Sequence, residues 1–182
     1  MNLELTYQSR IAEYLQIDAE QVSLYWKGRV ALYTVLKAMG VGPGDEVILP
    51  AFTCVVVPNA ILYLGAIPIY VDINPDTLCC DAAQIERALS PKTKVILIQN
   101  MLGLSVEVSE IITLAKAHGI YTIEDCTHGF GGKHQGVFNG LRSDASFFSS
   151  QWNKPFSTGI GGMLLVNNRD LLQPVNQLNS HL

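Results

Sequence analysis

The chain has 182 residues, which is long enough for one well-packed domain. Hydrophobic residues make up 48% of it and charged residues only 15%, so we expect a large buried sheet and exclude a disordered chain. The net charge of -4, with no cluster of basic residues, argues against nucleic acid as the main partner.

The cysteines indicate a reducing environment. Cys54, Cys79, Cys80 and Cys126 match no zinc-binding spacing, so we predict no metal site and a cytoplasmic protein. The N-terminal residues Met-Asn-Leu-Glu-Leu-Thr lack the basic and apolar regions of a secretory signal peptide.

An uncharged stretch from Val47 to Val71 is long enough to span a bilayer by the usual criterion of about 20 residues. Pro50, Pro58 and Pro68 interrupt it, however, and its pattern changes from strand-like to helical and back. We therefore predict a strand, a helix and a strand of a buried sheet, and no membrane partner.

Strands and helices alternate along the chain. The apolar periodicity predicts helices over 8–16, 30–39, 53–64, 82–89 and 106–118, and strands over 22–29, 46–49, 67–73, 94–98, 120–123, 145–148 and 163–166. A further helix begins near residue 169. This alternation predicts an α/β fold, a mainly parallel sheet with helices on both faces, and residues 1–182 as a single domain.

Ligands of parallel α/β sheets bind at the carboxyl ends of the strands. Four polar clusters fall at such ends, namely Lys27-Gly-Arg29, Asn100, Asp125 with His128, and Ser149 to Lys154. We expect them to form one site.

Each cluster taken alone has an ordinary explanation. Lys154 could be a solvated lysine in a glycine-containing surface loop, Asp125 a helix cap or a member of a structural ion pair, and Gly28 a common strand-to-helix turn. Together they suit pyridoxal phosphate. A desolvated lysine can bind the cofactor covalently, an aspartate can keep its pyridine nitrogen protonated, and Ser149 with the N–H groups after Gly28 can hold its phosphate.

Longer motifs resemble one family. Gly42-Pro-Gly-Asp-Glu-Val-Ile-Leu-Pro-Ala-Phe-Thr53, Leu64-Gly-Ala-Ile-Pro, Val71-Asp-Ile-Asn-Pro-Asp-Thr77, Ile123-Glu-Asp-Cys-Thr-His128 and the stretch around Lys154 are similar to the DegT/DnrJ/StrS family. The resemblance implies the large domain of the aspartate aminotransferase fold, the cofactor pyridoxal 5'-phosphate, and transfer of an amino group from a donor such as glutamate to a keto sugar, mostly nucleotide-linked.

The resemblance also implies individual roles. Lys154 matches the lysine that binds the cofactor, Asp125 the partner of the pyridine nitrogen, and His128 the residue against the cofactor ring. Ser149 matches a phosphate-binding serine, and Gly28, Arg29 and Val30 match the phosphate loop. Because a lysine is retained at 154, the aminotransferase branch fits better than the dehydratase branch, which has histidine there.

The chain departs from the family pattern at two positions. Cys54 lies where many relatives have an aromatic residue stacked on the cofactor, and Ile160 lies where they usually have an acidic residue. The chain is also about half the family's usual length, so we expect the small domain to be absent. The resemblance further implies a homodimer whose subunits share their active sites.

Two other functions remain as alternatives. One is a catalytically incomplete homologue that binds cofactor or pairs with a subunit. The other, an unrelated nucleotide-binding module, is weaker because no Gly-x-Gly-x-x-Gly follows the first strand and no Walker pattern occurs.

Overall fold

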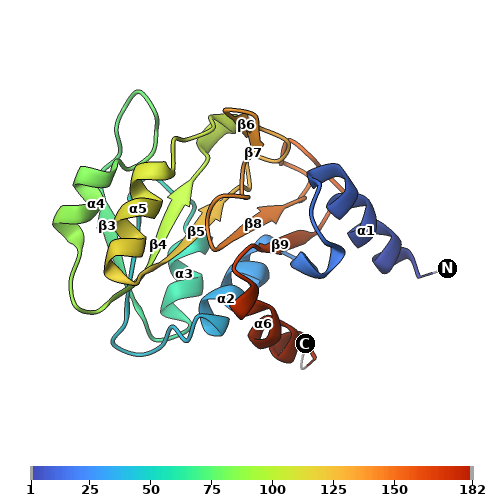
Figure 1. Cartoon of the computed structure of the whole chain (residues 1–182), viewed down its shortest axis with the longest axis horizontal. Helices are drawn as coiled ribbons and strands as arrows, with labels where there is room; N and C mark the ends of the chain where they lie inside the picture. Colours follow the sequence, from blue (N-terminus) through green and yellow to red (C-terminus); the bar gives the residue numbers. More distant parts are fainter. Residues whose placement is uncertain (1, 181–182) are drawn as a thin grey trace.

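A computed structural model describes residues 2–180 (Figure 1). Its centre is a seven-stranded sheet in the order β1-β9-β8-β5-β4-β2-β3. The strands are β1 (Val22–Tyr25), β2 (Glu46–Pro50), β3 (Ile67–Val71), β4 (Thr93–Gln99), β5 (Tyr121–Asp125), β8 (Ala145–Ser149) and β9 (Gly162–Val166). Strand β9 is antiparallel to both β1 and β8, and the other adjacent pairs are parallel. The predicted α/β fold with a mainly parallel sheet is confirmed.

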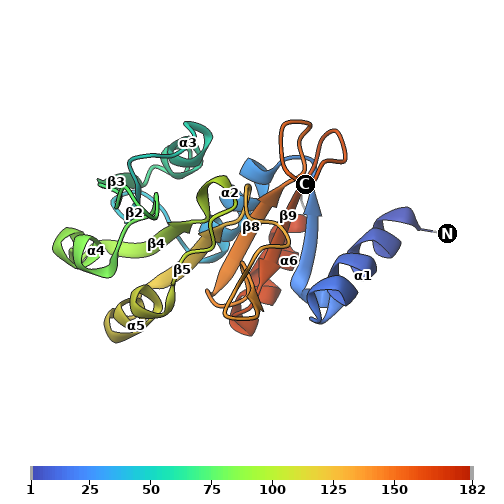
Figure 2. The same cartoon turned by 90° about the horizontal axis from the view of Figure 1, so that it is seen from above.

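Helices cover both faces of this sheet, as Figures 1 and 2 show. They are α1 (Leu3–Leu15), α2 (Gly28–Ala38), α3 (Val56–Leu62), α4 (Ala82–Ala88), α5 (Ser109–His118) and α6 (Leu172–Asn179). Helices α2, α3 and α6 pack on one face, and α1, α4 and α5 pack on the other. The alternation of side chains along each strand supplies both cores. Val47 and Leu49 of β2 pack with α2 and α3, whereas Ile48 packs with α4 and α5.

The same alternation orients the end of β5. Ile123 packs in the cluster formed with α2 and α3, and Asp125, two residues later, therefore points to the same face. In the parallel register Asp125 lies between Gln99 of β4 and Phe147 of β8. The carboxylate is thus placed at the C-terminal edge of the sheet, on the side covered by α2 and α3.

Several boundaries differ from the sequence-based ones. The first helix, predicted from residue 8, begins at Leu3 because the Asn2 side chain accepts a hydrogen bond from the Glu4 N–H at 3.1 Å. The strand predicted over 22–29 ends at Tyr25, and α2 begins at Gly28 rather than Val30. The helices predicted from residues 53 and 106 begin later, at Val56 and Ser109.

Other local predictions are confirmed. Asp81 caps α4 by accepting a hydrogen bond from the Gln84 N–H at 2.9 Å, and Gly119 ends α5 with a φ of 66°. The C-terminal run begins as a 3-10 turn (Arg169–Leu171) and continues as α6, and its last two residues lie outside the described residues. A short hairpin of β6 (Lys133–His134) and β7 (Val137–Phe138) was not predicted.

The uncharged stretch from Val47 to Val71 forms the end of β2, then α3 and β3, as predicted. Among residues 2–180, no helix is both long enough and apolar enough to cross a bilayer.

Candidate active site at the C-terminal edge of the sheet

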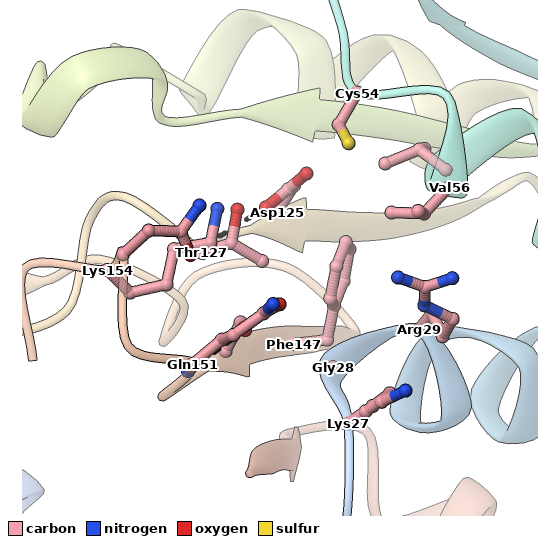
Figure 3. A pocket seen from close by; sticks show the side chains of 13 residues that line it. Lys27, Gly28, Arg29, Cys54, Val56, Asp125, Thr127, Phe147, Gln151 and Lys154 are labelled. Atoms are coloured by element: carbon pink, nitrogen blue, oxygen red, sulfur yellow. Dashed lines mark hydrogen bonds between the residues drawn. The ribbon is translucent and has the colours of Figure 1, made fainter. Parts of the chain in front are cut away.

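A cavity of about 110 Å³ lies at the C-terminal ends of β5 and β8 (Figure 3). Six residues singled out in the sequence line it: Gly28, Arg29, Cys54, Asp125, Ser149 and Lys154. They come from four separate parts of the chain, which the parallel sheet brings to one edge.

The N-terminus of α2 forms one wall of the cavity. It approaches β8 closely, since a Cβ atom at Gly28 would lie 2.8 Å from the carbonyl oxygen of Phe148. Within the described residues, the N–H groups of Gly28 and Arg29 have no hydrogen-bond acceptor. Free N–H groups at the positive end of a helix dipole suit an anion such as phosphate.

Val30 is placed differently from the other two residues of this predicted loop. Its N–H donates to the carbonyl of Lys27 at 3.0 Å, and the residue does not line the cavity. The reason is that α2 starts two residues earlier than the sequence pattern indicates, so that Val30 lies within the first helical turn.

Asp125 lies at the floor of the cavity and is only 3% exposed. Its Oδ1 accepts a hydrogen bond from the N–H of Thr127 at 2.9 Å. Burial raises the pKa of Asp125 above its usual value, and the hydrogen bonds from Thr127 and the charge of Lys154 act in the opposite direction. The carboxylate forms no ion pair within residues 2–180. A buried and unpaired carboxylate in a cavity is suited to a cationic group of a ligand.

Lys154 comes from the loop between β8 and β9. Its N–H donates to the carbonyl of Gln151 at 2.9 Å, and Gln151 forms an isolated bridge with Gly159. The loop therefore folds back on itself and is further tied by a 2.7 Å hydrogen bond between the hydroxyls of Ser150 and Thr158. Figure 3 shows Lys154 on one side of Asp125 and Arg29 on the other.

Ser149 and Cys54 complete the predicted set. Ser149 ends β8 and pairs in register with Gly162 of β9. Cys54 follows β2, and Figure 3 shows its sulfur pointing toward Asp125. From the resemblance, residue 54 is a position where many relatives carry an aromatic side chain. In this chain the smaller thiol of Cys54 lines the cavity there.

His128 lies beside the cavity and is not among the residues that line it. Its Nδ1 accepts a hydrogen bond from the N–H of Leu102 at 3.4 Å. Burial lowers the pKa of His128, and the positive charge of Lys154 lowers it further. His128 is thus close enough to Lys154 to sense its charge, and it is directed toward the loop after β4.

Asn100, which also follows a strand end, is buried and forms hydrogen bonds inside the protein rather than in the cavity. Its Nδ2 donates to Glu124 at 3.1 Å, and its Oδ1 accepts from the N–H of Val106 at 3.1 Å. It does not line the cavity.

Seven other residues line the cavity without an individual role predicted from the sequence: Lys27, Val56, Val57, Thr127, Phe147, Gln151 and Asn153. Two of them could have been predicted from the sequence. Phe147 lies two residues before Ser149 and shares a strand face with it, and Thr127 lies two residues after Asp125 in the same turn. Gln151 and Asn153 are placed by the folded loop, which sequence periodicity does not describe.

The charges of the cavity are unbalanced. Lys27, Arg29 and Lys154 are cationic and Asp125 is the single carboxylate among its lining residues. None of the three cations forms an ion pair in the part of the chain that the structure describes. This arrangement fits a dianionic phosphate that accepts hydrogen bonds at the α2 end and a protonated ring nitrogen that donates to Asp125.

Solved structures of similar fold include aminotransferases. The aminotransferase TlmJ from Streptoalloteichus hindustanus superposes with a TM-score of 0.92 at 30% identity, over 97% of this chain and 48% of that one. NtdA from Bacillus subtilis, solved with the bound cofactor PMP, has a TM-score of 0.79 and 29% identity, over 97% of this chain and 45% of NtdA. The fold is therefore shared with about half of each of these solved chains.

The DegT/DnrJ/EryC1/StrS aminotransferase family profile matches residues 4–181, and the chain belongs to this family. GDP-perosamine synthase of Escherichia coli O157:H7 is 37% identical over 165 residues, which cover 91% of this chain and 45% of the synthase. The chain thus spans about half the length of the relatives it matches. The predicted resemblance is confirmed.

Proposed function

We propose that this chain is the cofactor-binding part of an aminotransferase that uses pyridoxal 5'-phosphate to move an amino group from a donor such as glutamate to a keto sugar, carried on a nucleotide. The observation that carries the proposal is the cavity in which Asp125 and Lys154 face the free N–H groups of Gly28 and Arg29. Membership of an aminotransferase family supports it.

The α2 end of the cavity is proposed to hold the phosphate. The N–H groups of Gly28 and Arg29 and the hydroxyl of Ser149 are donors, and the guanidinium of Arg29 adds a positive charge. Val30 contributes to this loop by closing the first turn of α2. Hydrogen bonds between a charged group and these donors contribute about 1.5–3 kcal/mol each.

Asp125 is proposed to hold a proton at the ring nitrogen. Its burial makes the bare carboxylate unfavourable, so a cation beside Oδ1 and Oδ2 is stabilised strongly. Pyridoxal phosphate, when bound there, supplies an aromatic ring that accepts electrons from the substrate carbon.

Lys154 is proposed to act as nucleophile and then as base. Its Nζ, when deprotonated, would hold the cofactor and would move the proton at the substrate carbon as a general base. His128, whose lowered pKa keeps it neutral at neutral pH, lies beside Lys154 without adding a second charge. Cys54 and the apolar side chains of Val56, Val57 and Phe147 form the wall around the ring.

We also propose a cytoplasmic homodimer made from this single domain of residues 1–182. All four cysteines are free, which agrees with a reducing compartment. The large apolar side chains at the two ends of α3 are exposed, Val55 by 67% and Tyr63 by 75%, and a groove of about 290 Å³ runs between α2 and α3. A second copy of the chain would cover such a surface.

The test is a titration of the protein with pyridoxal phosphate, followed by visible absorption. The wild-type chain is expected to develop a saturable visible band, as is Lys92→Ala, a control variant in an exposed turn. Lys154→Ala is expected to develop none. A band of equal strength in Lys154→Ala, or no band in the wild type, would overturn the proposal.

A further inference from the structure

Cys54 differs from the other three cysteines in exposure. Cys79, Cys80 and Cys126 are buried, with exposed fractions of 1%, 4% and 0%, whereas Cys54 is exposed. Burial raises the pKa of the Cys79 and Cys126 thiols and raises that of Cys80 to about 12, so these three are poor nucleophiles in the folded chain. The folded protein therefore presents one accessible thiol to a reagent in solution.

The backbone directs this thiol into the cavity. The carbonyl of Cys54 accepts a hydrogen bond from the N–H of Val57 at 2.9 Å, which fixes residue 54 at the start of the turn that leads into α3. Val56 and Val57, just after it, line the same cavity. In Figure 3 the sulfur points toward the carboxylate of Asp125.

Asp125 is an independent sign that a ligand occupies this space. The residue is only 3% exposed and lines the cavity. Its Oδ1 accepts one hydrogen bond, from the N–H of Thr127, and the carboxylate has no ion-pair partner among residues 2–180. Asp125 and Cys54 line the same cavity, and the Cys54 sulfur points toward the Asp125 carboxylate in Figure 3. A cationic ring that meets this carboxylate therefore takes up the space that the sulfur faces.

We propose that Cys54 is a modification site controlled by the cofactor: soft electrophiles such as α,β-unsaturated carbonyl compounds add to its sulfur only while the cavity is free, and this modification and cofactor binding exclude one another. The inference rests on the proposed function, since it takes the ring of pyridoxal phosphate as the occupant. The thiolate sulfur adds to one carbon of the reagent's double bond and a proton from water goes to the other, so nothing is oxidised and no group leaves.

N-ethylmaleimide is the probe, and the readout is the mass of the peptide that contains Cys54. In the absence of cofactor, Cys54 is expected to be labelled and Cys126 to remain unlabelled. With pyridoxal phosphate at about 100 times its Kd, about one site in 100 is free, so labelling should slow by about 100-fold. Conversely, protein labelled first should fail to develop the visible band on titration.

Cys54→Ser is the matched control. Treatment of this variant with N-ethylmaleimide should leave its cofactor titration the same as that of its untreated sample, whereas treatment of the wild type should abolish the band. Cys126 reports whether the fold has stayed intact, because its labelling requires the core to open.

The outcomes separate this inference from the function on which it rests. If the visible band forms but Cys54 reacts at an unchanged rate, or if labelled protein still takes up cofactor, Cys54 is not controlled by the cofactor and the proposed function stands. If treatment of Cys54→Ser abolishes its band, or if Cys126 is labelled together with Cys54, another thiol or unfolding causes the loss and the inference is wrong. If the untreated wild type develops no band, both are wrong.

Discussion

Gly162 of β9 lies directly against Gly28, the first residue of α2: a Cβ atom at position 162 would overlap the backbone nitrogen of Gly28 and the carbonyl of Lys27. Two glycines that touch in this way bring the N-terminus of the helix onto the sheet. The free N–H groups of Gly28 and Arg29, which we propose to hold the phosphate, depend on this contact.

We expect Gly162→Ala to push α2 away from β9 and to lower the free energy of unfolding by about 1–3 kcal/mol, as overpacking of a dense interior does. It should also weaken pyridoxal phosphate binding, because the N–H groups of Gly28 and Arg29 move with the helix. Gly42→Ala is the control, since a Cβ atom there meets nothing within 4 Å. Urea unfolding and cofactor titration of both variants test this. Equal stability of the two variants would contradict the close contact between Gly162 and the start of α2.

Asp125→Asn should stabilise the cofactor-free chain at neutral pH. Burial raises the pKa of Asp125 in the folded state above its unfolded value of about 3.9. A raised pKa means that the folded chain binds this proton more tightly than the unfolded chain does. The contribution of Asp125 to the free energy of unfolding is therefore fully present below the unfolded pKa and is lost as the pH rises through the folded pKa.

The variant carries no such charge, and its Oδ1 can still accept the hydrogen bond from Thr127. The gain in unfolding free energy should be near zero at low pH and on the order of 1–3 kcal/mol at neutral pH. Asp76→Asn, at an exposed turn residue, is the control for the same change of side chain outside the cavity. A gain that is the same at both pH values would contradict the assignment of the cost to the buried carboxylate.

Arg29→Thr should weaken the binding of pyridoxal phosphate by about tenfold, or about 1.4 kcal/mol, because the guanidinium lines the cavity and forms no ion pair in the described residues. The matched control is pyridoxal, which lacks the phosphate and should bind wild type and variant alike. The difference between the two proteins should shrink at high salt, where the charge is screened. An equal loss for pyridoxal and for its phosphate would place Arg29 away from the phosphate.

His128 should titrate below its ordinary pKa, because burial and the charge of Lys154 both disfavour the imidazolium. Lys154→Ala should therefore raise the pKa of His128, and Lys92→Ala should leave it unchanged. NMR titration of the histidine ring protons measures both. If removal of Lys154 leaves the pKa of His128 where it was, the two side chains are not neighbours in solution.

Sequence periodicity is sufficient to predict the sheet. The pattern along Val47, Ile48 and Leu49 indicates a strand buried on both faces, and the structure confirms this with two separate cores. The ends of elements are harder to predict because they depend on single hydrogen bonds. The side chain of Asn2 extends α1 by five residues relative to the periodic pattern, from residue 8 to residue 3.

The site was predictable where strands deliver its residues. Asp125 and Ser149 end β5 and β8, and parallel strands necessarily bring such ends together. The orientation of His128 and the lining roles of Gln151 and Asn153 were not predictable from residue type. They depend on how loops close, as in the bridge between Gln151 and Gly159, and the periodicity of apolar residues does not encode such a pairing within a loop.

The central claim is that Lys154 is the residue that binds pyridoxal phosphate. The direct measurement is borohydride reduction of the protein with bound cofactor, followed by digestion and mass spectrometry of the labelled peptide. We predict a single pyridoxyl label, on Lys154, in the wild type and none in Lys154→Ala. A label on Lys27 or on any other lysine, or a labelled Lys154→Ala, would contradict the account.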